Sequence, residues 1–165
     1  MAANLQEIKR TLEIFKPDDI IEVRAFGSKN AVYSGYFKNH DKLIEQISRY
    51  PNETFYFVMN KIDNACYSRD QCEKIVLNPK LSTKDKDISK IDWILIDVDP
   101  RRISGVSASD DEKAKSKVII GRIYNFLNEK GFEKPIIGDS GNGYHLLYKT
   151  AAENTDSVEA LIKKF

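Results

Sequence analysis

Two carboxylates stand one residue apart at the end of an apolar run in the chain. Asp97 and Asp99 end the run that starts at Trp93, and Pro100 follows them. Side chains two residues apart on a strand point the same way, so these carboxylates repel each other unless a divalent cation neutralises them. Hard oxygen ligands suit magnesium or manganese, and two such ions roughly 3.5–4 Å apart are typical of phosphoryl transfer. The alternative is a solvated turn in which aspartates cap the backbone.

A glycine-rich turn that leads to a histidine is the second candidate. It contains Ser140, Gly141, Asn142, Gly143 and, after one further residue, His145. Glycine lets backbone amides approach an anion closely, and the serine hydroxyl can donate to the same anion. The histidine falls on the strand face opposite its apolar neighbours, where an imidazole can bind a phosphate oxygen or act as an acid or base. The alternatives are an ordinary hairpin turn with a structural histidine, and a serine hydrolase, which the glycine spacing disfavours.

The two motifs, in this order and with a helix between them, resemble those of the archaeo-eukaryotic primase superfamily. The first motif of that family is an apolar strand that ends in two acids, and the second is a serine followed by a histidine among glycines. The similarity is greatest to the primase-polymerases of phages, plasmids and mobile elements. It covers about residues 19–149, and the loop over residues 99–109 is similar to that of the element-borne branch.

The resemblance implies metal-dependent, template-directed nucleotidyl transfer by a DNA primase or polymerase. It implies that Asp97 and Asp99 bind two Mg²⁺ or Mn²⁺ ions and that these two residues and His145 are catalytic. Ser140, Gly141, Asn142, Gly143 and His145 would bind a nucleoside triphosphate, and a DNA template and primer would be the other partners.

The same resemblance implies a third acid on a strand that follows the histidine strand, and this chain does not contain it. We therefore expect residues 1–165 to be the N-terminal part of a primase-polymerase catalytic domain, with weak or no activity in isolation. A helicase domain is a candidate partner in the full-length parent.

Four other polar residues are lesser candidates. Arg24, on the polar face of an early strand, and Asn60, at the end of a later strand, could also bind the triphosphate. A surface arginine and a turn asparagine are the alternatives. Arg101 and Arg102, beside the acidic pair, could contact template or triphosphate, or simply carry solvated charge.

The fold predicted around these residues is α/β to α+β: a mixed β-sheet with flanking helices, similar to a primase catalytic core but incomplete at the C-terminus. Hydrophobic periodicity predicts the elements. Helices are expected over residues 5–15, 41–50, 71–77, 110–130 and 155–165. Strands are expected over residues 20–26, 31–37, 54–59, 93–99, 135–138 and 144–149.

Three of these elements carry more detailed predictions. The strand over residues 93–99 is apolar on both faces up to Asp97, which predicts a central strand. Ser109 and Glu112 match a capping box at the start of the long helix, and Gly131 marks its end. The inward side of this helix is predicted to consist of Ala114, Val118, Ile119, Ile123, Phe126 and Leu127. Residues 80–90 read as an exposed loop.

Composition limits the class of protein. The chain has 165 residues, a net charge of +1 and 41% hydrophobic residues, which fits one globular domain. Apolar runs are too short to span a membrane, no signal peptide is recognised, and two cysteines do not make a disulfide scaffold, so a cytoplasmic location is expected.

Two other functions remain open. One is a non-catalytic nucleotide- or nucleic-acid-binding replication module. The other is a different Asp-x-Asp metalloenzyme, such as a glycosyltransferase or a phosphatase of the haloacid dehalogenase type. The pair Pro100-Arg101 after the second acid disfavours that phosphatase.

Overall fold

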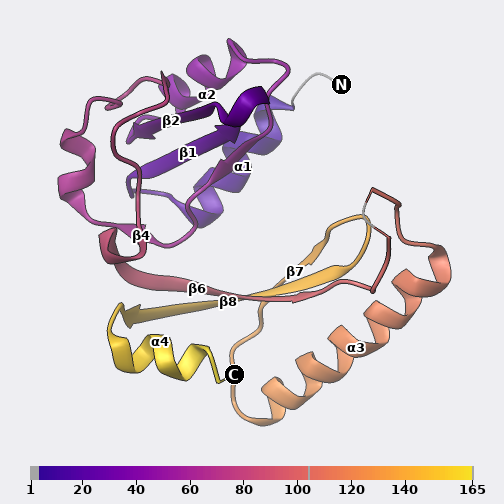
Figure 1. Ribbon diagram of the computed structural model, residues 1–165. Helices are drawn as coiled ribbons and strands as arrows, with labels where there is room; N and C mark the ends of the chain where they lie inside the picture. The colour runs from indigo at the N-terminus through magenta and orange to yellow at the C-terminus, as the bar shows by residue number, and fades with distance from the viewer. Residues whose placement is uncertain (1–3, 104, 165) are drawn as a thin grey trace. The chain divides into compact units, whose positions relative to one another are not determined.

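The computed structural model describes residues 4–103 and 105–164 of the chain (Figure 1). The described residues form four α-helices and two four-stranded sheets. They group into two units, one of Met1–Ile91 with Ala152–Phe165 and one of Asp92–Ala151. Within the part of the chain that the structure describes, no helix is long and apolar enough to cross a membrane.

The architecture is α+β, and one part of the fold prediction is wrong. We expected a single mixed sheet, but the strands divide into two sheets, in the orders β3-β1-β2-β5 and β4-β6-β8-β7. Short turns connect β1 to β2 and β7 to β8, and a short turn can join only antiparallel neighbours. The hairpin signals in the sequence thus predicted antiparallel pairs, but they did not show that the strands separate into two sheets.

The first unit is a sheet covered by two helices. Apolar residues alternate along β1, so Ile21 and Val23 face a core with Leu12 of α1, Phe37 of β2 and Leu43 of α2. The elements of this unit are α1 (Leu5–Phe15), β1 (Ile21–Phe26), η1 (Ser28–Asn30), β2 (Val32–Phe37), α2 (His40–Ser48), β3 (Phe55–Phe57), β4 (Lys61–Ile62), η2 (Asn64–Ser68), β5 (Val76–Leu77), η3 (Asp85–Asp87) and α4 (Asp156–Ile162).

The stretch before the acidic strand differs from the prediction. Residues 71–77 are not a helix, because Val76 and Leu77 form β5 and pair with the edge of β2. Residues 80–90 are not one exposed loop: they include η3, and Thr83 is buried. In both places a partner far away in the sequence satisfies the backbone or covers the side chain.

The polar face of the first sheet carries a buried network of charged groups. Glu22 is fully buried and accepts hydrogen bonds from Ser34 Oγ (2.8 Å) and Arg24 Nη2 (2.7 Å). Arg69 donates to the Tyr36 hydroxyl (2.6 Å) and to the Asp87 carboxylate (2.9 Å). Buried charges are tolerated when they are paired in this way, so these groups fasten the segment around η3 to the sheet.

The second unit is a sheet with one long helix along one face. It contains most of β6 (Ile88–Val98), α3 (Asp110–Glu129), β7 (Ile136–Asp139) and most of β8 (Tyr144–Glu153). Figure 1 shows α3 lying along the strands, and Ile120 and Leu127 of this helix pack against Leu146 and Tyr148 of β8. The opposite face of these strands carries the candidate site.

Two details of this unit correct the sequence predictions. Leu95 of β6 is 50% exposed, so the strand is not buried on both faces up to Asp97. The predicted inward face of α3 is also rotated: Val118, Ile119 and Phe126 are about half exposed, and Ala114 is exposed as well. The buried residues of α3 are Ser116, Ile120 and Leu127, with Ile123 packed against them.

The ends of the helices agree well with the predictions. The capping box of Ser109 and Glu112 is present, and α3 ends at Glu129, two residues before Gly131. At α4, the Thr155 side chain caps the helix by accepting from the Val158 amide. Phe165, at the end of the predicted last helix, and Ser104, in the predicted loop, lie outside the described residues.

A substitution at Asp87 tests how much the buried network contributes to the stability of the first unit. The Lys84 backbone amide and then the Arg69 guanidinium donate to its carboxylate and hold the pKa of Asp87 below its ordinary value. Asp87→Asn should therefore lower the free energy of unfolding by about 1–3 kcal/mol at neutral pH. Urea unfolding measures this loss.

The pH dependence follows from the direction of the shift. A lowered pKa in the folded state gives stability above the unfolded pKa that is lost as pH falls through the folded pKa. The gap between Asp87→Asn and the native chain should therefore close in acid. Asp85→Asn, on the same turn, is the control and should stay within about 0.5 kcal/mol; equal losses for both variants would contradict the network.

Candidate functional site

Strand β6 positions the first acid by simple alternation. Ile96 and Val98 pack into the core under α3, so Asp97 between them projects from the opposite face. Its side chain is 53% exposed. Asp99 follows directly after the strand, and its side chain is 43% exposed. Both carboxylates are therefore accessible to a ligand.

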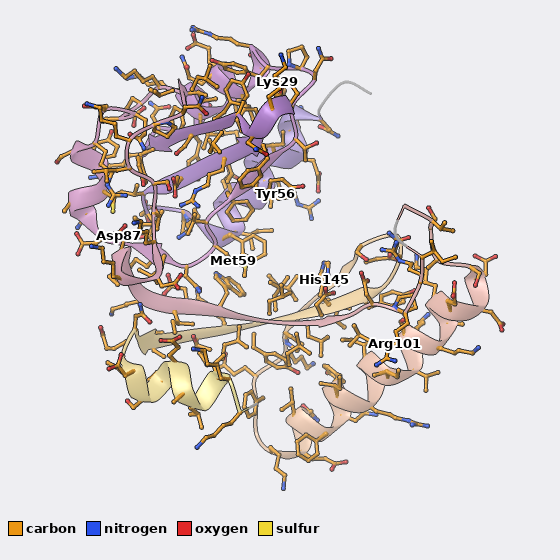
Figure 2. The ribbon with its side chains drawn as sticks, in the orientation of Figure 1. Lys29, Tyr56, Met59, Asp87, Arg101 and His145 are labelled. Atoms are coloured by element: carbon orange, nitrogen blue, oxygen red, sulfur yellow. The ribbon has the colours of Figure 1, made fainter. Side chains whose placement is uncertain are left out.

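His145 reaches the same face from the neighbouring strand. Tyr144 and Leu146 of β8 face the core, which leaves the imidazole on the side away from α3, as Figure 2 shows. Its Nδ1 atom lies 3.6 Å from Asp97 Oδ1. The predicted metal ligand and the predicted phosphate ligand are thus neighbours across two strands.

Gly138 of β7 makes room for this histidine, and the sequence prediction did not include it. Gly138 and His145 are partners in the β7–β8 ladder. A Cβ atom at position 138 would lie 2.2 Å from Cδ2 and 2.3 Å from Nε2 of the imidazole. The ring therefore lies over the glycine backbone, and any side chain there would displace it.

The turn between β7 and β8 is internally hydrogen-bonded. The Gly143 amide donates to Ser140 Oγ (2.9 Å), and the Ser140 amide donates to the Gly143 carbonyl (3.1 Å). The Gly141 amide donates to Asp139 Oδ1 (2.8 Å). These three amides are thus already engaged, which differs from the expected cradle of free amides. The hydroxyl hydrogen of Ser140 is one donor that this turn can offer to an anion.

The turn lies directly against the second acid. A Cβ atom on Gly143 would be 2.3 Å from Asp99 Oδ1 and 2.3 Å from the Val98 carbonyl oxygen. The first of these distances involves a side chain, but the second involves the backbone of β6, which has no rotamer to change. Glycine is therefore required for the turn to pack on the end of the acidic strand.

Further contacts hold the turn in place from the α3 side. Asn142 Oδ1 accepts from the Ala108 amide (3.0 Å), just before the helix begins. Lys113 of α3 forms an ion pair with Asp139 (2.9 Å) and lies over the Tyr144 ring. Their shared hydrogen bond raises the pKa of Lys113 and lowers the pKa of Asp139. Asn142 thus positions the loop that precedes the helix in this structure.

Arg102, three residues after Asp99, contacts the second acid. Its Nη2 atom lies 3.7 Å from Asp99 Oδ2, and its Nη1 atom donates to the Val106 carbonyl (2.8 Å). Its side chain is 25% exposed. The Arg102 side chain therefore points back toward Asp99.

Two predicted binding residues lie in the other unit. Arg24 forms an ion pair with buried Glu22 and donates to the Thr83 carbonyl. The Asn60 carbonyl accepts from Lys16 Nζ (2.6 Å). Asn60 also lines a pocket of about 470 Å³ whose charged walls are Asp85, Asp156 and Glu159, with one cation, Lys86. The acids outnumber the single lysine, so the balance of charge does not favour a triphosphate.

Two carboxylates that could bind a metal ion are accessible, but a complete set of metal ligands is not present among the described residues. Among residues 4–103 and 105–164, no group of three or more His, Cys, Asp or Glu side chains is placed to hold a metal ion. Asp97 and Asp99 nevertheless supply accessible carboxylate oxygens. Magnesium is commonly bound by one or two carboxylates, with water and substrate phosphates completing the shell. The two acids have the donor chemistry of such a shared site, and the metal site stays a prediction.

The contact between the turn and the acidic strand can be tested by adding one methyl group. Gly143→Ala should lower the free energy of unfolding by about 1–3 kcal/mol, because the Cβ atom overlaps the backbone of β6. It should also shift the His145 ring signals in NMR spectra, since the turn leads into that residue. Urea unfolding and the imidazole resonances measure the two effects.

Gly121→Ala is the matched control. A Cβ atom at position 121, inside α3, has no heavy atom within 4 Å, so this variant should be stabilised by up to about 1 kcal/mol. If both alanine variants gained stability, the turn could not lie against Asp99 as described.

Comparisons with known proteins add no relative to this description. A scan against protein-family models, a search of curated proteins and a search of solved structures each found no match to the chain. The function therefore has to be inferred from the geometry of Asp97, Asp99, His145 and the turn before it.

Proposed function

We propose that the second unit binds a nucleoside triphosphate with a divalent cation and serves nucleotidyl transfer of the primase-polymerase type. The observation that carries this proposal is the convergence of two distant motifs. The Gly143 backbone lies against Asp99, and His145 lies 3.6 Å from Asp97. The resemblance described above supports the proposal through the same residues and in the same order.

Each residue has a chemical role in this proposal. Asp97 and Asp99 would hold Mg²⁺ or Mn²⁺ through carboxylate oxygens, and Ser140 and His145 would donate hydrogen bonds to phosphate oxygens. A bound divalent cation would supply positive charge that stabilises the phosphates during transfer. Val98, packed in the core between the two acids, keeps their spacing.

The proposed reaction is a displacement at phosphorus. The 3′-hydroxyl oxygen of a growing strand forms a bond to the α-phosphorus, and the bond from that phosphorus to the oxygen bridging to the β-phosphate breaks. Pyrophosphate leaves, and the hydroxyl proton passes to water. Positioning and electrostatics dominate such reactions, so half-exposed acids beside a rigid turn are a suitable arrangement.

A non-catalytic nucleotide-binding module is the second candidate, and the turn favours it. The amides of Ser140, Gly141 and Gly143 are engaged within the turn and with Asp139. Among the described residues, no group of three or more potential metal ligands is placed to complete a metal site. Such a module would bind the nucleotide through the same side chains but would not extend a primer.

The acids can be tested by direct binding. Asp97→Asn and Asp99→Asn should each weaken Mn²⁺ binding by at least the roughly 10–100-fold that loss of an outer partner of a metal site costs. Electron paramagnetic resonance counts free Mn²⁺, and calorimetry then measures dATP binding in its presence. Asp110→Asn, an exposed acid at the start of α3, carries the same charge change and should leave both affinities within about twofold.

The outcomes separate the candidates. Unchanged Mn²⁺ and dATP affinities in Asp97→Asn would refute a nucleotide site at these acids. Acid-dependent binding with extension of a primed template in manganese supports the transferase, and binding without extension supports the module. A preference for a nucleotide sugar over dATP would point to a glycosyltransferase instead.

A further inference from the structure

Arg102 occupies one side of the Asp99 carboxylate. Its Nη2 atom lies 3.7 Å from Asp99 Oδ2, which makes an ion pair but is too long for a hydrogen bond. The other oxygen of the same carboxylate, Oδ1, lies against the backbone at Gly143. The carboxylate is therefore held between the turn on one side and a guanidinium on the other.

The arginine side chain is held by its own loop. Arg102 Nη1 donates to the Val106 carbonyl (2.8 Å), and the side chain is only 25% exposed. Arg102 also helps to hold the pKa of Glu112 below its ordinary value, after the Ser109 backbone amide, the Ser109 hydroxyl and Lys115. The guanidinium thus lies beside the second acid of the site, and its charge also acts on Glu112 at the start of α3.

A guanidinium and a divalent cation compete for one carboxylate. Both are positive, so they repel each other when they share a small anion. The ion pair at 3.7 Å is loose and partly exposed, and its partner can therefore be exchanged. An arginine that is freed beside a triphosphate has a suitable new partner, because its planar donors match phosphate oxygens in pairs.

We propose that Arg102 is an exchangeable counter-ion of the site. It neutralises Asp99 before a divalent cation binds, leaves the carboxylate when the cation arrives, and then contacts the phosphates of the nucleotide. This inference rests on the proposed function, because it needs Asp99 to be a metal ligand. It assigns to one arginine both the protection of the acid and part of the recognition of the triphosphate.

A different role for Arg102 would have the opposite sign. Residues that hydrogen-bond to metal-binding carboxylates orient them, and removing such a partner weakens metal binding. Removing a competitor strengthens it. The direction of the change in Mn²⁺ affinity therefore distinguishes exchange from orientation.

The test uses Arg102→Gln in the full chain. Glutamine retains a donor for the Val106 carbonyl but removes the charge. Without nucleotide, Mn²⁺ affinity measured by electron paramagnetic resonance should rise about two- to fivefold, the range that a partly exposed ion pair contributes. With saturating Mn²⁺, the affinity for dATP measured by calorimetry should fall about tenfold or more. The first effect should shrink in high salt.

Two further variants serve as controls. Arg102→Lys keeps the charge, so its Mn²⁺ affinity should stay near that of the native chain, while dATP binding is only partly restored. Arg101→Ala removes the exposed neighbouring arginine and should leave both affinities within about twofold. Thermal melting confirms that each variant is folded before binding is measured.

The failures of the two proposals can be told apart. If Asp99→Asn weakens Mn²⁺ binding but Arg102→Gln lowers it or leaves it unchanged, the exchange is wrong and the metal site remains. If Mn²⁺ binding is independent of Asp97 and Asp99, both proposals are wrong.

Discussion

The close approach of the Gly143 backbone to Asp99 is the constraint on which the second unit's site depends. It places a turn between two strands directly on the end of a third, where no side chain fits between them. The turn leads into β8, so its position also determines where His145 lies on that strand. Asn142, in the same turn, then holds the Ala108 amide and with it the approach to α3. The contact of the Gly143 backbone with Asp99 thus helps to position the Asp99 carboxylate, the His145 imidazole and the start of α3.

The charges of the two units differ in how they are satisfied. In the first unit, Glu22 is fully buried and its partners lie at hydrogen-bonding distance. In the second unit, Asp97 and Asp99 are about half exposed, and their neighbours, the His145 imidazole and the Arg102 guanidinium, lie at 3.6 Å and 3.7 Å. Tight buried pairs fix a structure, whereas loose exposed pairs leave charge for a ligand. Arg24 belongs to the tightly paired groups of its own unit, whereas the two acids of the second unit do not have such close partners.

Local signals in the sequence were reliable where local chemistry decides the structure. The apolar stripe of α1 and the capping box of Ser109 and Glu112 gave those helix ends closely. The orientation of α3 was not predictable, because Val118, Ile119 and Ile120 are consecutive and only the packing chooses which of them is buried. The strand at Val76 was missed for a related reason: it exists because the edge of β2 is beside it.

The candidate site shows the same division. Alternation along each strand correctly separated Asp97 and His145 from the core-facing residues. That β6 and β8 are neighbours is a long-range property, and no periodicity reveals it. Gly138 was missed because its importance lies in the His145 ring above it. The engaged amides of the turn were missed because Ser140 and Asp139 could equally have pointed to solvent.

The alternation of β6 also imposes a rule of parity on the evolution of this chain. Loss or gain of one residue between Trp93 and Asp97 would reverse the face of every side chain after the change. Both acids would then point toward α3, and Val98 would point to solvent. Two residues could be lost or gained with the faces preserved. Length variation in this strand should therefore be accepted in even steps, and the paired spacing of Asp97 and Asp99 would survive only in lineages that obey it.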